Sequence, residues 1–323
     1  MSKSTLSRAP ALAVALTGLL AAGGGQAAPA WRGSSITVSN VVSLNTLDES
    51  AEPTYNPYYV VQTTFAPQWW LTDQLYLRGS IGFSREITDS DITTRDGETV
   101  LSDTTLGLGA QLWKIPVVGI DTAASLDVRL PTGPYSQAQT LVAAVSPAVS
   151  LRRTFPSALG FSVGYRVGMT RFFHEYTTGE LDSPYLQGCR TAAVGCEPFL
   201  NTGVRNTRVR LSQSGSLSLS PWSWVSASAG ATWLHDYLHP ATVPAEVNFE
   251  PQAPQDTRTT LSWSLELAFV PFDALTIALG TSTTNPQRAP NGDNYDPFIN
   301  RNTELALDLR LDVAALAAPW TED

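Results

Sequence analysis

Twelve segments of this chain alternate apolar and polar residues, and the connections between them are short and long in turn. Between positions 304 and 313, every odd position holds Leu or Val, while the even positions hold Glu, Ala, Asp, Arg and Asp. Successive side chains of a β-strand point to opposite faces, so each segment would have one apolar and one polar face. The predicted strands span residues 35–46, 57–68, 74–86, 103–114, 119–131, 141–153, 160–176, 204–219, 223–237, 257–270, 274–284 and 301–313.

Proline marks every short connection, whereas the long connections are polar. Antiparallel neighbours are the strands that a short turn can join. The pattern therefore predicts a series of hairpins that close into an all-β, antiparallel up-and-down barrel. The prolines of the predicted short turns are Pro67, Pro116, Pro156, Pro221 and Pro271, and the long connections span about 47–56, 87–102, 132–140, 177–203, 238–256 and 285–300.

A soluble β-sandwich would also alternate, with its apolar face in a core, but three features favour the barrel. The segments are longer than the five or six residues usual in soluble sheets. Their polar face is rich in Ser, Thr, Gly and Ala rather than Lys and Glu. Aromatic residues also gather at two levels, as they do at the two interfaces of a bilayer. One group is Trp69, Trp70, Trp113, Phe155, Trp222, Trp224 and Phe272, and the other is Tyr58, Tyr59, Phe83, Phe172, Phe173, Tyr176 and Tyr237.

Residues 1–30 have the features of a secretory signal peptide. Lys3 and Arg8 give a positive start, residues 11–22 are apolar, and residues 28–30 read Ala-Pro-Ala, a small-x-small cleavage site. The apolar run is shorter than the roughly 20 residues that span a bilayer as a helix. We therefore predict cleavage rather than a retained membrane helix. Residues 31–323 show no linker or shift of composition, which predicts a single domain.

The charge of the chain argues against nucleic acid as a partner. There are 20 basic and 29 acidic residues, and without Lys3 and Arg8 the net charge is −11. Domains that bind nucleic acid carry basic patches or stripes. The acidic surplus lies mostly in the long connections. No later window approaches 18 consecutive apolar residues, so no membrane-spanning helix is predicted.

Both cysteines, Cys189 and Cys196, fall in one long connection with six residues between them. In a secreted chain, such spacing favours a local disulfide over a zinc site, because two thiols with no nearby His cannot complete a tetrahedral shell. We predict a structural disulfide that tightens this connection.

Taken together, these features resemble Gram-negative outer-membrane β-barrel proteins, over the whole chain after residue 30. The resemblance rests on pattern and not on a short motif. It implies a transmembrane barrel of about twelve strands with short periplasmic turns, long extracellular loops and both termini in the periplasm. It also implies outer-membrane lipids and the barrel-assembly machinery as partners. Such barrels often end on an aromatic residue, whereas here Trp320 stands three residues before the end.

The polar face of such a barrel would line the lumen, because an Arg that faces lipid at mid-depth costs about 2–4 kcal/mol. A basic wall would come from the fifth to eighth strands and an acidic wall from the tenth and twelfth. This arrangement resembles the twelve-stranded porins for acidic sugars in strand number and lumen arginines. The predicted lumen-lining residues are Arg78, Arg129, Arg152, Arg166, Arg208, Arg210, Arg310, Asp121, Asp127, Glu266, Asp308 and Asp312.

These charges predict a passive channel for small hydrophilic solutes, including anionic ones, because a guanidinium binds carboxylate or phosphate through two hydrogen bonds. The alternative is that the charges pair with one another and fill the lumen. The protein would then be a structural or surface-interaction barrel that works through its outer loops. No cofactor is predicted in either case.

Two enzyme families with barrels of this size can be compared by motif. Outer-membrane phospholipases carry His-x-Ser, and none of His174, His235 and His239 has that context. Outer-membrane aspartyl-type proteases carry Asp-x-Asp and Asp-x-His. Asp89 and Asp91 match the first pair, but Asp236 is three residues before His239, one too many for the second. The oxygen-rich run 291–296 could hold calcium, but turn chemistry explains it equally well. An outer-membrane hydrolase is therefore only the third alternative, and neither enzyme activity nor a metal site is predicted.

Overall fold

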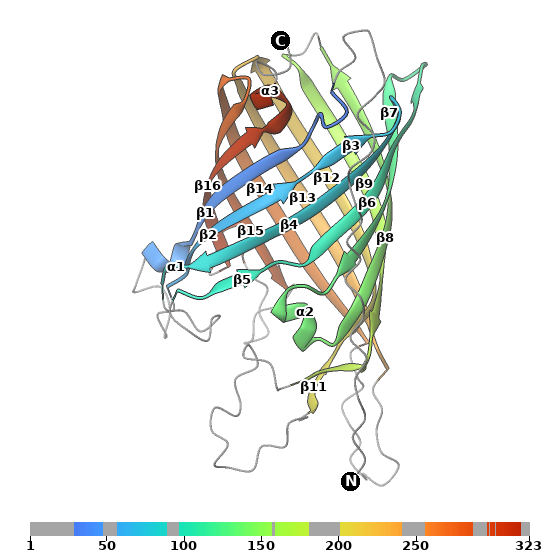
Figure 1. Ribbon diagram of the computed structural model, residues 1–323, viewed down its shortest axis with the longest axis vertical. Helices are drawn as coiled ribbons and strands as arrows, with labels where there is room; N and C mark the ends of the chain where they lie inside the picture. The colour runs from blue at the N-terminus through green and yellow to red at the C-terminus, as the bar shows by residue number, and fades with distance from the viewer. Residues whose placement is uncertain are drawn as a thin grey trace.

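One antiparallel sheet closes on itself in the computed structural model of the protein (Figure 1). β1 (Ser35–Ser43) pairs with β2 (Tyr59–Ala66) on one side and with β16 (Thr303–Asp312) on the other. Closure gives the first and last strands hydrogen-bonding neighbours on both sides. The structure describes residues 29–47, 57–88, 97–156, 159–180, 201–240, 256–286, 296, 298–300 and 302–317.

Strands account for most of the described chain, and three short helices flank them. The remaining strands of the barrel are β3 (Gln68–Trp70), β4 (Leu75–Glu86), β5 (Thr99–Leu101), β6 (Thr104–Ile115), β7 (Ile120–Leu130), β8 (Leu141–Phe155), β9 (Phe161–His174), β12 (Thr207–Trp222), β13 (Val225–Leu238), β14 (Thr257–Phe272) and β15 (Leu275–Pro286). β10 (Thr178–Glu180) and β11 (Asn201–Arg205) form a separate pair. The helices are α1 (Leu44–Leu47), α2 (Pro134–Ala138) and α3 (Val313–Ala317).

The 14 strands of the main sheet occupy twelve positions around the barrel. β3 continues β2 beyond Pro67 and pairs with the same neighbour, β4. In the same way β5 and β6 both pair with the other side of β4. The predicted fold class, a closed antiparallel barrel of about twelve strands, is confirmed. The predicted strand bounds differ from the observed ones by three residues or fewer.

Three of the five prolines that were predicted to mark turns do not stand in turns. Pro116 and Pro156 do stand in turns, but Pro67 separates β2 from β3, and Pro221 and Pro271 are the second-last residues of β12 and β14. The strand register shifts at the last two, between residues 219 and 222 and between residues 269 and 272. Proline has no N–H to give to a ladder, so it is tolerated where a bulge interrupts the pairing.

The register assigns the two faces of the sheet, because cross-strand partners lie on the same side. Leu307 of β16 pairs with Leu279 of β15, and both are exposed on the outer face. Asp308 pairs with Ala278, which is buried, on the lumen face. Large apolar side chains are therefore presented outward, where an aqueous environment would be unfavourable and a lipid one favourable. Among the described residues, the one cluster of buried apolar side chains is Leu141, Ala144 and Phe172.

The two ends of the barrel differ. The short connections and α3 lie at one end, which we call the turn end, and α1, α2 and the β10–β11 pair lie at the other, the loop end (Figure 1). Residues 29–34 are bound at the turn end, where the carbonyl oxygen of Arg32 accepts a hydrogen bond from Trp70 Nε1 at 3.0 Å. The Arg32 guanidinium stacks on the Trp70 ring, 4.1 Å from its centroid.

Several predictions concern residues outside the described part of the chain. They include most of the predicted signal peptide, the predicted Cys189–Cys196 disulfide, and Asp89 and Asp91. Cleavage after residue 30 and the single domain 31–323 therefore stay predictions. No helix within the described ranges is long and apolar enough to cross a membrane.

Candidate functional site

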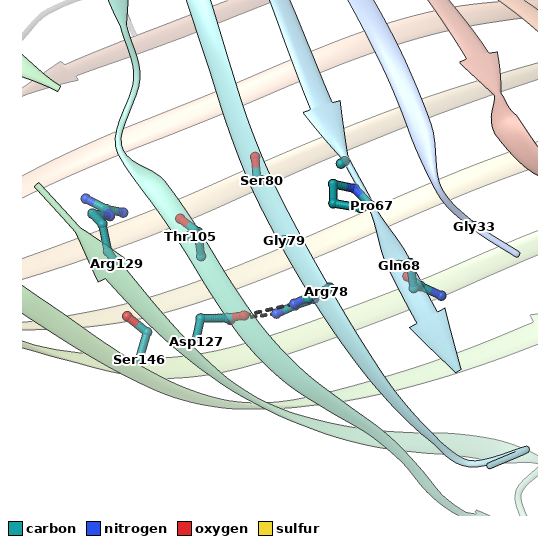
Figure 2. A pocket seen from close by; sticks show the side chains of 11 residues that line it. Gly33, Pro67, Gln68, Arg78, Gly79, Ser80, Thr105, Asp127, Arg129 and Ser146 are labelled. Atoms are coloured by element: carbon teal, nitrogen blue, oxygen red, sulfur yellow. Dashed lines mark hydrogen bonds and ion pairs between the residues drawn. The ribbon is translucent and has the colours of Figure 1, made fainter. Parts of the chain in front are cut away.

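An ion pair between Arg78 and Asp127 crosses three strands on the lumen face (Figure 2). Arg78 Nε donates to Asp127 Oδ1 at 2.8 Å, and Nη2 donates to Oδ2 at 2.5 Å. Arg78 lies on β4 and Asp127 on β7, and Gly107 of the intervening β6 is the cross-strand partner of both. A Cβ at position 107 would overlap the Asp127 carboxylate and come within 3.0 Å of Arg78 Nε. Glycine thus lets the ion pair lie flat against the wall.

Asp127 is shared between two arginines. Arg166 Nη2 lies 3.9 Å from Asp127 Oδ2 and donates to Ser125 Oγ at 3.1 Å. The Asp127 side chain is 15% exposed, against 44% for Arg166. One carboxylate therefore compensates two guanidinium groups, which leaves this part of the wall positive.

A hollow of about 430 Å³ opens beside this cluster. Its lining comes from β2, β3, β4, β6, β7 and β8 and from Gly33 before β1, and Figure 2 shows Arg129 pointing into it without a dashed contact to the residues drawn. Within the described ranges, Arg129 makes no ion pair or hydrogen bond. Hydroxyl groups surround it. The polar residues that line the hollow are Gln68, Arg78, Ser80, Thr105, Asp127, Arg129 and Ser146.

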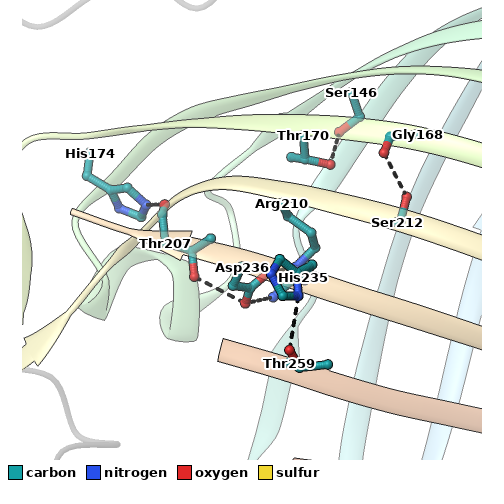
Figure 3. A network of polar contacts seen from close by, with 10 residues as sticks. All are labelled: Ser146, Gly168, Thr170, His174, Thr207, Arg210, Ser212, His235, Asp236 and Thr259. Carbon is teal, nitrogen blue, oxygen red and sulfur yellow. Dashed lines mark hydrogen bonds and ion pairs between the residues drawn. The ribbon is translucent and has the colours of Figure 1, made fainter. Parts of the chain in front are cut away.

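A second ion pair lies nearer the loop end (Figure 3). Arg210 Nε and Nη2 donate to the two carboxylate oxygens of Asp236 at 2.5 and 2.8 Å. The Asp236 side chain is 4% exposed and also accepts a hydrogen bond from Thr207 Oγ1 at 3.3 Å. The charge of Arg210 is therefore compensated locally. The adjacent His235 is on the outer face and bonds Thr259, because neighbouring residues of an extended strand point to opposite faces.

Residues 131–140, which we call the rim loop, fold onto the lumen side of the loop end and contain α2. Ser136 Oγ donates to Asp103 Oδ2 at 2.5 Å, and Gly133 N donates to Asp103 Oδ1 at 3.0 Å. At the other end of the loop, Thr140 has a φ of 54°. This is unusual for a β-branched residue and needs support from its surroundings. Tyr176 N donates to Thr140 Oγ1 at 3.2 Å, and Glu175 N donates to the Thr140 carbonyl at 2.9 Å.

The opposite wall carries most of its charge as carboxylates. Arg310 Nη2 lies 3.6 Å from Glu266 and 3.9 Å from Asp308. Asp312 Oδ1 accepts hydrogen bonds from Ala314 N and Ala315 N at the start of α3, so it belongs to the turn end.

On the basic side, Arg152 donates to Ser162 Oγ at 3.2 Å. The Arg208 side chain is exposed beside the register shift that opens β12.

An acidic group at the loop end was not predicted. Glu86 of β4 is 2% exposed. Glu304 of β16 belongs to the same region, because the negative charges of both carboxylates affect the ionisation of Tyr58. Burial, with the negative charges of Glu304 and Glu86, raises the pKa of Tyr58 to about 12. The alternation of β16 could have identified Glu304, because it shares the lumen face with Asp308.

The ion pairs divide the predicted lumen residues into two kinds. Arg78, Arg166, Arg210 and Arg310 lie in pairs with Asp127, Asp236, Glu266 and Asp308, whereas Arg129 projects into the hollow. The basic wall and the acidic wall therefore differ less in net charge than the order of the strands predicted. Asp236 and the rim loop were not among the predicted site residues. The alternation of β13 could have placed Asp236 on the lumen face. Pro134 after Gly133 could have predicted the start of a helix, because proline is common at the first helical position.

The described residues contain no group of three His, Cys, Asp or Glu side chains placed to hold a metal ion. The oxygen-rich run 291–296 lies outside the described part of the chain except for Asp296. Asp296 Oδ1 accepts hydrogen bonds from Phe298 N at 2.8 Å and from Ile299 N at 3.1 Å. These bonds hold the pKa of Asp296 below its usual range and are typical of a turn.

No protein-family model matches the sequence, and no curated protein matches it either. An outer membrane channel from Pseudomonas putida F1 superposes with a TM-score of 0.52 at 10% sequence identity, over 90% of this chain and 99% of that chain. The chain has the fold of an outer-membrane β-barrel. The KdgM porin, with a TM-score of 0.43 at 7% identity, and the NanC porin, with 0.44 at 8%, each match 86% of this chain and 98% of theirs.

Proposed function

We propose that this protein is a passive channel of the outer membrane for small hydrophilic solutes, and that it prefers anions. The observation that carries the proposal is Arg129, a lumen arginine that has no counter-charge within the described ranges and that faces a hollow of about 430 Å³. An apolar outer face and a polar inner face support a water-filled, lipid-embedded barrel. The partners are then outer-membrane lipids, the solutes and the barrel-assembly machinery, without nucleic acid, cofactor or catalysis.

The charges around the hollow favour an anion over a cation. Two guanidinium groups, those of Arg78 and Arg166, share the carboxylate of Asp127, and Arg129 adds a third guanidinium that has no ion pair within the described ranges. The excess of positive charge attracts carboxylate or phosphate, and the free guanidinium of Arg129 can bind either through two parallel hydrogen bonds. Ser80, Thr105 and Ser146 offer hydroxyl donors to the same solute.

The membrane orientation follows from the same proposal. Short connections of such barrels face the periplasm and long ones face outward. The turn end, with β1 and α3, would then be periplasmic, and the rim loop would lie at the outer mouth. Both termini would be in the periplasm.

The test is ion selectivity in a planar lipid bilayer. The full mature barrel is refolded, its folding is checked by heat-dependent gel migration, and reversal potentials are recorded in a salt gradient. Arg129→Ala should lower the anion-to-cation permeability ratio by about fifteenfold, since a unit charge at about 5 Å in water-like surroundings favours an anion and disfavours a cation by roughly 0.8 kcal/mol each. Arg153→Ala is the matched control, because Arg153 stacks on Phe155 on the outer face.

Two outcomes would count against the proposal. A folded barrel that passes no current would favour the alternative, a structural or surface-interaction barrel that acts through its outer loops. Equal effects of the Arg129 and Arg153 substitutions would remove Arg129 from the selectivity of the channel.

A further inference from the structure

His174, the last residue of β9, contacts both the start of β12 and the rim loop, and Figure 3 shows it beside Thr207. Its Nδ1 is 2.8 Å from the carbonyl oxygen of Gln139, and its Nε2 is 3.1 Å from the carbonyl oxygen of Thr207. A carbonyl oxygen accepts hydrogen bonds and never donates them. Both contacts can therefore be hydrogen bonds only when both ring nitrogens carry protons, which is the case only in the imidazolium form.

Loss of the second proton changes one of these contacts from attraction to repulsion. A neutral imidazole has one N–H and one nitrogen lone pair. The lone pair would then face a carbonyl oxygen, whose own lone pairs repel it. Either Gln139 in the rim loop or Thr207 in β12 would lose its bond to the ring, and the loop would lose part of its attachment to the wall.

Several charged and titratable groups lie near His174. Burial, followed by the positive charges of His174, Arg171 and Arg208, lowers the pKa of His239, whose ring is 5.8 Å away. The other charged or titratable neighbours are Arg210 and Asp236, which pair with each other, Glu175, which follows in sequence, and Tyr135 of the rim loop.

Contacts that do not titrate also hold the rim loop. Asn206 Nδ2 donates to the Gln139 carbonyl at 2.8 Å and to the Tyr176 carbonyl at 3.0 Å. Thr140 is bonded to Tyr176 and Glu175 as described above. The loop therefore has one attachment that depends on a proton and several that do not. Release of the first would loosen the loop without unfolding the barrel.

We propose that His174 is a proton-dependent latch, which holds the rim loop against the wall while both ring nitrogens carry protons and loosens it when a rise in pH removes one of them. The latch itself requires only the fold. Its effect on conduction rests on the proposed function: a loosened rim loop fluctuates more at the mouth of the lumen, so the current through the channel should become noisier at higher pH.

Hydrogen exchange of the refolded full barrel tests the latch directly. The amides of Thr140 and Glu175, which are bonded within and to the rim loop, are followed at about pH 5.5 and pH 8, on either side of the histidine range. After correction for the intrinsic rates, they should exchange about tenfold to a hundredfold faster at the higher pH, the factor expected for loss of one hydrogen bond to a charged group.

Two variants separate the latch from a general effect of pH. In His174→Gln the side-chain amide donates without titrating, so the pH dependence should disappear. His235→Gln is the matched control, because His235 is on the outer face and bonds Thr259, and it should behave like the wild type. An equal pH dependence in the wild type and His174→Gln would overturn the proposal. So would nitrogen NMR of a labelled barrel that finds one His174 ring nitrogen unprotonated at pH 5.5.

The two proposals fail separately. A barrel that passes no current but shows the exchange pattern would keep the latch and reject the channel. If the wild-type barrel conducts but its hydrogen exchange and current noise depend on pH no more than those of His174→Gln, the latch is rejected and the channel is kept.

Discussion

Arg78 and Asp127 are joined by two hydrogen bonds although their strands do not pair with each other. Gly107, between them, has no side chain to keep them apart. The ion pair therefore ties β4 to β7 across β6 without projecting into the lumen. The ion pair can therefore stiffen this wall while the lumen stays open. A pair that crossed the lumen would block it.

Gly107→Ala should destabilise the barrel. Its methyl group would overlap the Asp127 carboxylate and crowd Arg78, and overpacking of this kind costs about 1–3 kcal/mol of unfolding free energy. Denaturant unfolding followed by gel migration gives the measurement. Gly215→Ala is the control, because nothing lies within 4 Å of a Cβ built there. Equal stabilities of the two variants would show that the Arg78–Asp127 pair moves aside freely.

Asp127→Asn should increase anion preference. The change removes the single carboxylate that Arg78 and Arg166 share, so the wall beside the hollow gains one net positive charge. At about 5 Å in water-like surroundings, a unit charge changes the anion-to-cation ratio by about fifteenfold, because it acts on the two ions with opposite sign. The measurement is the reversal potential in a salt gradient, with Asp312→Asn at the turn end as the control. A shift toward cations would contradict an anion path along this wall.

Arg210→Ala should lower the unfolding free energy of the barrel and change its ion selectivity little. Arg129→Ala should do the reverse. Asp236 already compensates Arg210, and its 4% exposed carboxylate would be left without its partner. Loss of one partner from a buried pair costs about 3–5 kcal/mol. Unfolding midpoints and reversal potentials of the two variants are measured side by side. The interpretation fails if Arg210→Ala changes selectivity as much as Arg129→Ala does.

Acidification should destabilise the loop end through His239. Its folded pKa is lowered by burial and by nearby positive charges. As the pH falls below about 6.5, the unfolded chain binds a proton that the folded chain does not, so the unfolding free energy decreases until the folded pKa is reached. His239→Phe should lose less stability than the wild type between pH 7 and 5.5.

Alternation alone was enough to predict the strands. The strand β16 has leucine at 305, 307, 309 and 311, and all four side chains point to the same face. That face needs apolar surroundings whichever strands lie beside β16. Local pattern was less reliable for prolines. Pro221 and Pro271 looked like turn residues but lie at bulges inside strands, because the position of a bulge depends on the register of the partner strand.

The pairing of charges could not be predicted from the strand order. Arg210 and Asp236 are 26 residues apart and meet because β12 and β13 are in one register, and Arg78 meets Asp127 only because β6 places a glycine between them. Thus the sequence by itself determined the barrel, its number of strands and the residues of each face, since these depend on a period of two along the chain. Only the tertiary structure decided which arginines are compensated, that Arg129 faces the hollow, and that His174 bonds the rim loop, since these depend on register and loop placement.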